Sequence, residues 1–240
     1  MTAIKLVAIS SALCITLSAR AQGTFENLDF ESANPISAGN PEVPSAVTFA
    51  SALPGWSGSL GGAPATQALL NNYDLGAASI DIFGPGWNST GPGIIDGNYT
   101  VYLQAGAGPG GDGSYNASLY QNGTIPVNAA SLQFKAWSQY TPAYFALSFA
   151  GNSLAYSILS SGTSPSGQSY YIYGANLASY AGQTGQLEFT AIDNNPPGNI
   201  ELDDITFSTQ SVPEPNPFLL TGLGGTLFGL YRRFAPKRCS

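Results

Sequence analysis

Carboxylates, aromatic rings and amides are the side chains of this sequence that could do chemistry. The sequence has 14 Asp and Glu residues and no histidine, and its two cysteines lie close to the two ends. A Ser-His-Asp or Cys-His catalytic arrangement and the usual zinc ligand sets are therefore excluded. Two carboxylates could still hydrolyse a glycosidic bond, and Asp81 with Asp96 or Glu188 with Asp193 can be nominated. No motif supports either pair, so an acid-pair glycosidase is the least favoured alternative.

Aromatic rings beside hydrogen-bonding side chains are typical of sugar-binding sites. Trp87 lies in a Gly- and Pro-rich loop sequence, and Trp137 follows Gln133 with the alternation of a strand. Tyr140 comes in the next turn. We therefore name Trp87, Trp137, Gln133 and Tyr140 as candidate ligand-binding residues. The alternative for both tryptophans is that they cover the edge of the core, and Trp56, after a Pro-Gly turn, is expected inside it.

Short alternating runs separated by Gly, Pro, Asn and Ser fill the middle of the chain and predict an all-β fold. The predicted strands are Ser79–Phe83, Tyr99–Ala105, Tyr115–Gln121, Ser131–Gln139, Tyr144–Ala150, Ser153–Leu159, Ser169–Tyr173, Gly185–Ile192 and Asn199–Ser208. Ala150–Ser153 predicts a hairpin turn. This many strands in one cysteine-free block indicate a two-sheet antiparallel sandwich.

One predicted strand shows the alternation clearly. In Ser131–Trp137 the side chains of Leu132, Phe134 and Ala136 point one way, and those of Gln133, Lys135 and Trp137 point the other. We expect the first set in the core. The second set should form an outward or concave face.

The charge of the chain is low and unevenly placed. Charged residues make up only 9% of the sequence, against about 25% in an ordinary soluble domain. Within residues 22–211, Lys135 is the only basic residue and 13 residues are acidic, which gives a formal charge of −12. Such a surface repels phosphate backbones, so nucleic acid is excluded as a partner. It could attract cations.

The N-terminal end has the pattern of a secretory signal peptide. A basic residue precedes the apolar stretch Leu6–Leu17, and Ala19 and Ala21 are the small residues at −3 and −1 before Gln22. We therefore expect signal peptidase to remove residues 1–21. The alternative is a buried first helix.

The C-terminal end, residues 212–240, has three parts. They are Val212-Pro213-Glu214-Pro215, an apolar run expected to form a transmembrane helix over 217–231, and the basic pair Arg232 and Arg233. The 14-residue apolar stretch from Phe218 to Tyr231 would span about 21 Å as a helix, which is short of the ~30 Å hydrocarbon core. The arginines should stay cytoplasmic. Such a segment can pause in a membrane but is a weak permanent anchor.

This order of parts resembles a PEP-CTERM sorting signal, over residues 212–240. The resemblance implies export by a Gram-negative-type bacterium and handling by an exosortase-type sorting enzyme. It also implies delivery to the cell surface or the extracellular matrix, often together with extracellular polysaccharide. The basic tail after the arginines is longer than is usual for the family. The alternative is an ordinary short tail anchor.

The middle of the chain is similar to galactose-binding-like, carbohydrate-module jelly rolls. The landmarks that carry this resemblance are residues 27–31, 53–56, 181–189 and 200–207. The family's jelly rolls imply a structural calcium ion held by carboxylates near the first and last strands, which here are Glu31, Asp203 and Asp204. Hard oxygen ligands suit Ca²⁺. The alternative is that Asp203 and Asp204 cap or bulge the last strand.

Together these patterns predict a signal peptide over 1–21, a β-sandwich ectodomain over 22–211 and a sorting signal over 212–240. We expect an exported, non-catalytic structural or adhesive component associated with exopolysaccharide. The first alternative is a carbohydrate-binding module.

Overall fold

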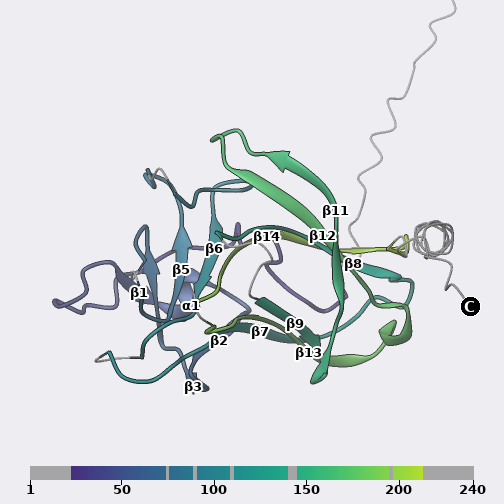
Figure 1. The fold of residues 1–240 in the computed structure, drawn as a ribbon, viewed down its shortest axis with the longest axis horizontal. Helices are drawn as coiled ribbons and strands as arrows, with labels where there is room; N and C mark the ends of the chain where they lie inside the picture. The colour runs from purple at the N-terminus through teal and green to yellow at the C-terminus, as the bar shows by residue number, and fades with distance from the viewer. Residues whose placement is uncertain are drawn as a thin grey trace, which may run out of the picture.

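The structure is a computed structural model that describes residues 23–73, 76–88, 91–108, 111–139, 145–194 and 197–212. These residues form two β-sheets packed against each other (Figure 1). Their only helices are α1 (Phe49–Ala52) and the 3₁₀ turn η1 (Ala178–Tyr180). The predicted all-β, two-sheet sandwich is thus confirmed.

The larger sheet has eight strands. From edge to edge they are β1 (Ala46–Thr48), β4 (Gln67–Leu70), β5 (Ser79–Phe83), β6 (Thr100–Gln104), β14 (Asn199–Ser208), β8 (Ser131–Trp137), β12 (Ser169–Asn176) and β11 (Tyr156–Thr163). All neighbours are antiparallel except β4 and β5, which are parallel. The antiparallel prediction therefore fails at this one pair.

The smaller sheet has six strands, all antiparallel. In order they are β10 (Asn152–Ser153), β9 (Phe145–Phe149), β13 (Thr184–Ala191), β7 (Ala117–Thr124), β2 (Ser57–Leu60) and β3 (Ala63–Pro64). The turn predicted at Ala150–Ser153 joins β9 to β10, with Ala150 and Gly151 at positive φ. The predicted strand Ser153–Leu159 is wrong as one element, because the chain leaves β10 and enters the other sheet at β11.

The core lies between the two sheets and contains the side chains that the alternation of β8 predicted. Leu132, Phe134 and Ala136 are buried there. The Phe134 ring packs against four other aromatic rings, those of Phe145, Tyr156, Tyr173 and Phe189. Trp56 is also inside, as predicted, and its indole N–H donates to the Asn27 carbonyl (2.9 Å). These contacts hold β8 in a fixed orientation, so its outward side chains are fixed as well.

The first described residues run beside the last strand. The Ile205 amide donates to the Leu28 carbonyl (2.9 Å), and Phe25 stacks on Phe207 with ring centroids 5.4 Å apart. The ladder between β14 and β8 shifts register between Asp203 and Thr206. Segments from the two ends of the described domain therefore lie side by side, and β14 contains a bulge at this point.

The two terminal predictions cannot be placed on this fold. The predicted signal peptide, 1–21, and the predicted transmembrane helix, 217–231, lie outside the described residues, and so does the candidate ligand residue Tyr140. Within the described part of the chain, no helix is long and apolar enough to cross a membrane.

Candidate functional site

The outward face of the eight-stranded sheet carries the candidate groups. Gln133, Lys135 and Trp137 of β8 are half-buried on this face. On the neighbouring strand β14, Glu201 pairs with Trp137 and Asp203 pairs with Lys135. Directly paired residues present their side chains on the same side of a sheet. This face therefore gathers a tryptophan, the only cation of the described residues and two carboxylates.

A pocket of about 400 Å³ opens beside Trp137. Its lining residues, which define the Trp137 pocket, are Trp137, Ser161, Gly162, Thr163, Ser169, Tyr170 and Tyr171. They come from the end of β8 and from the hairpin of β11 and β12. The volume falls in the range of about 300–1,000 Å³ that is usual for small-ligand sites. Of its aromatic residues, Trp137 and Tyr170 lie on the outward face, whereas Tyr171 pairs with the core residue Ala136 and so points to the other side of the sheet. The lining contains no charged residue.

Glycine at position 162 is what lets the Tyr170 ring occupy this pocket. A Cβ atom at Gly162 would lie 2.6 Å from Cζ and Oη of Tyr170, so the ring lies across the bare backbone of β11. Tyr171 pairs with Ala136, which places Tyr170 opposite Trp137 on the outward face. The two rings are thus neighbours across the sheet, and β8 and β12 set their spacing.

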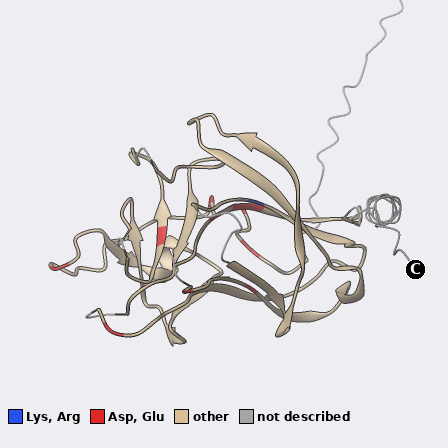
Figure 2. Cartoon of the chain, viewed as in Figure 1, with Lys and Arg blue, Asp and Glu red and all other residues tan. Residues whose placement is uncertain are grey.

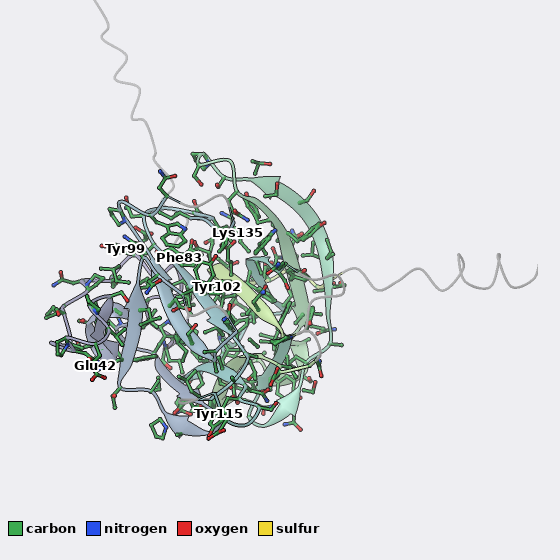
Figure 3. All side chains as sticks on the ribbon, turned by 60° about the vertical axis from the view of Figure 1, so that its left-hand side comes forward. Glu42, Phe83, Tyr99, Tyr102, Tyr115 and Lys135 are labelled. Carbon is green, nitrogen blue, oxygen red and sulfur yellow. The ribbon has the colours of Figure 1, made fainter. Side chains whose placement is uncertain are left out.

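Trp87 is less available than its loop sequence predicted. Its ring stacks on Phe83 with centroids 4.3 Å apart and 4° between planes, and its N–H donates to the Pro92 carbonyl (2.8 Å). Phe83 in turn contacts Tyr102 of the next strand, and both carry labels in Figure 3. One face of the indole is therefore covered, as in the alternative in which Trp87 closes over the core edge.

A second uncharged pocket of about 390 Å³ lies at the free edge of the Trp87 ring. Its lining residues are Trp87, Asn88, Gly91, Gly93, Ile94, Ser166, Gly167 and Gln168. The turn between β11 and β12 thus has an uncharged pocket on either side. Of the two candidate tryptophans, Trp137 has a second ring of its pocket, that of Tyr170, on its own face of the sheet, whereas no second aromatic residue lines the pocket at Trp87.

The structure brings the predicted calcium-binding residues together. Glu31, Asp203 and Asp204 line one small pocket of about 210 Å³, and Asp29 and Asp96 line it too. We call it the acidic pocket. The three residues that the sequence resemblance named therefore line one pocket.

The carboxylates of the acidic pocket have protein partners in this structure. The Lys135 ammonium lies 2.6 Å from Asp96 Oδ2 and 3.1 Å from Asp204 Oδ2. Glu31 accepts hydrogen bonds from the backbone amides of Asn98 (2.7 Å) and Tyr99 (2.9 Å). In the part of the chain that the structure describes, no group of three or more His, Cys, Asp or Glu residues is placed to hold a metal ion. A lysine thus supplies positive charge where calcium was expected, and the calcium site stays a prediction.

Asp203 is buried beneath the loop that follows Trp87. The Thr100 hydroxyl (2.5 Å) and the Asp96 amide (3.1 Å) donate to its Oδ2, and the Asp204 amide donates to Oδ1 (2.7 Å). Burial raises the pKa of Asp203 to about 8, although these hydrogen bonds favour the charged form. The side chain therefore fixes the loop and the β14 bulge to the sheet.

Glu201, which the sequence analysis did not select, is equally buried. The Gly93 amide donates to its Oε1 (2.5 Å), whereas Oε2 has no hydrogen-bond partner among the described residues. Burial raises the pKa of Glu201 well above its usual value. Its alternation with Ile200 and Leu202 could have placed it on the outward face, but its burial depends on the distant loop at Gly93.

The nominated glycosidase pairs gain no support from this arrangement. Asp81 is fully buried, and Asp96 is paired with Lys135. Glu188 lies on β13 of the other sheet, and Asp193 accepts a hydrogen bond from the Ser114 hydroxyl (2.5 Å). None of these carboxylates lines the Trp137 pocket.

Comparisons with known proteins show no relationship that could assign the chain. No family model matches it, and no curated protein matches it. Among solved structures, the enzymatically active domain of tailspike protein 4 of bacteriophage CBA120 is similar over 65% of this chain and 19% of that chain, with 9% identity and a TM-score of 0.33. The chain thus spans about a fifth of that structure's length, and the likeness is too weak for a functional argument.

Proposed function

We propose that this chain is an exported, non-catalytic protein of the cell surface or extracellular matrix whose sandwich binds polysaccharide in the Trp137 pocket. The supporting observation is the pocket itself, where the rings of Trp137 and Tyr170 are neighbours on the outward face of the sheet. Aromatic faces stack on the apolar faces of sugar rings, and hydroxyl groups exchange hydrogen bonds with sugar hydroxyls.

The pocket favours a binding role over a purely structural one. A structural or adhesive component that only fills a matrix needs no concave aromatic site. Here the Tyr170 ring nevertheless lies opposite Trp137 and depends on the missing side chain at Gly162. We therefore combine the two hypotheses from the sequence: the chain is a surface protein, and its sandwich acts as a carbohydrate-binding module.

Retention on polysaccharide tests the binding part of the proposal. The full-length chain is run through gels containing a panel of polysaccharides, next to Trp137→Ala and Gly162→Ala variants. The matched control is Tyr120→Ala, which removes a half-buried ring from the outward side of β7 on the other sheet. We expect saturable retardation that both pocket variants weaken at least about tenfold and the control leaves intact. Retardation that persists in Trp137→Ala would contradict the proposal.

The resemblance of 212–240 to a sorting signal and the signal-peptide pattern of 1–21 support the export part. The test is the mass of the protein recovered from its native cell surface. We expect a chain that begins at Gln22 and ends near Val212–Pro215. A chain that still ends at Ser240 would instead support a plain tail anchor.

A further inference from the structure

We infer that the polysaccharide bound in the Trp137 pocket is a neutral glycan, and that the protein rejects glycans that carry carboxylate, sulfate or phosphate groups. This inference rests on the proposed function and adds the chemical class of its ligand. It follows from the chemistry of the pocket wall and from the charges that surround it.

The pocket wall offers nothing to an anion. Its lining consists of aromatic, Ser, Thr and Gly residues, and the Tyr170 hydroxyl on the outward face both donates and accepts hydrogen bonds as sugar hydroxyls do. Proteins recognise sulfate, phosphate and carboxylate groups mainly through Arg and Lys, often in bidentate geometry. The pocket at Trp87 likewise has no charged residue in its lining.

The single nearby cation is already engaged. Lys135 is the only Lys or Arg among the described residues, and its ammonium lies 5.6 Å from the centroid of the Tyr170 ring at the pocket. Asp96 and Asp204 hold that ammonium at 2.6 and 3.1 Å, and only 18% of the lysine side chain is exposed. An anionic sugar would have to break both ion pairs to use this charge.

The remaining charges near the pocket are negative. Figure 2 shows one blue segment on the described chain, on β8, with red segments beside it. Asp29, Glu31 and Asp96 of the acidic pocket lie close to Lys135, and so does Asp204 on β14, the neighbour of β8. Adjacent strands are about 4.8 Å apart, and the Debye length is about 10 Å at 0.1 M salt. An anion in the Trp137 pocket therefore feels these carboxylates.

Matched polysaccharides with and without charge test this inference. The full-length chain is titrated with hydroxyethyl cellulose against carboxymethyl cellulose, and with dextran against dextran sulfate, at low and at high salt. For the backbone that binds, we expect the neutral member to bind at least about tenfold more tightly at low salt. The difference in affinity between the two members should decrease as salt screens the repulsion. Trp137→Ala should abolish binding of the neutral member.

The outcomes separate this inference from the proposed function. If the anionic member binds as tightly as the neutral one or more tightly, and Trp137→Ala abolishes that binding, the inference is overturned while the proposed function stands. If binding of every polysaccharide is absent or indifferent to Trp137→Ala, the proposed function fails and the inference fails with it.

A variant with an added positive charge tests the inference independently. Ser160→Lys adds a positive charge on the outward face two residues before Gly162, because Ser160 pairs with Ile172, which pairs with Lys135. Ser160→Gln is the uncharged control of similar reach. We expect Ser160→Lys, but not Ser160→Gln, to bind the anionic member of the pair more tightly than the unmodified chain does. Equal behaviour of the two variants would show that charge at the pocket does not set the ligand class.

Discussion

The free energy of unfolding should fall as the pH rises from about 5 to about 7, because two carboxyl groups are buried on the outward face of the sheet. Burial raises the pKa of Asp203 from 3.8 to about 8. Between these two values the folded protein holds a proton that the unfolded chain releases. The stabilisation is complete below the unfolded pKa and is lost as the pH rises through the folded pKa.

The size of the effect follows from the proton count. One such proton changes the unfolding free energy by about 1.4 kcal/mol for each pH unit, so Asp203 alone accounts for roughly 3 kcal/mol over two units. Burial also raises the pKa of Glu201, which adds a change of the same sign. Burial lowers the pKa of Lys135, but its hydrogen bonds to Asp96 and Asp204 outweigh that and raise it above 10.5, so it stays charged throughout this range.

Urea unfolding followed by tryptophan fluorescence at several pH values measures this slope. Asp203→Asn should reduce the slope by about 1.4 kcal/mol per pH unit. Its unfolding free energy at any one pH will also include the cost of the altered hydrogen bonds. Glu42→Gln is the control, because Glu42 is exposed and lies well away from Lys135 in Figure 3. A stability that is flat or rises over this range in the unmodified chain would refute the reasoning, as would an Asp203→Asn variant with an unchanged slope.

Three further outcomes are expected. Gly162→Ala should weaken polysaccharide retention while the melting midpoint moves little, because the new Cβ meets the far end of the Tyr170 side chain. A large loss of stability would show that the backbone, not the ring, is displaced. Trp87→Ala should destabilise the fold by about 2 kcal/mol through lost stacking on Phe83 and lost burial, as measured by urea unfolding, and should leave retention through the Trp137 pocket in place. A calcium chelator should leave the melting midpoint unchanged, because Lys135 supplies positive charge in the acidic pocket; a clear drop would restore the calcium hypothesis.

Strand position was predictable wherever one face of a strand packs on the core. Both β5 and β14 begin and end at the residues that the alternation indicated, and β8 stops two residues early, at Trp137. An alternating strand shows in its own sequence which side chains are apolar, so local pattern and tertiary burial agree. The short strands β1 to β4 were missed, because segments of two to four residues are too short to show a period.

The sequence also placed Glu31, Asp203 and Asp204 together, but only through a family resemblance. Nothing local in the chain indicated that Lys135 would reach into this cluster, since Asp204 lies on β14 and Asp96 lies in the loop before β6. The charge balance of the acidic pocket is therefore a property of the strand order β14-β8.

The sequence by itself determined the class of the fold, the outward orientation of Trp137 and the shortage of positive charge, because alternation and composition can be read from the sequence without knowing the fold. Tertiary structure alone decided that Tyr170 and Gly162 complete the pocket at Trp137 and that Trp87 is half covered by Phe83. It also decided that Glu201 and Asp203 are buried. Each of these facts depends on a contact between segments far apart in the sequence, and a single strand carries no signal of which neighbour will cover it.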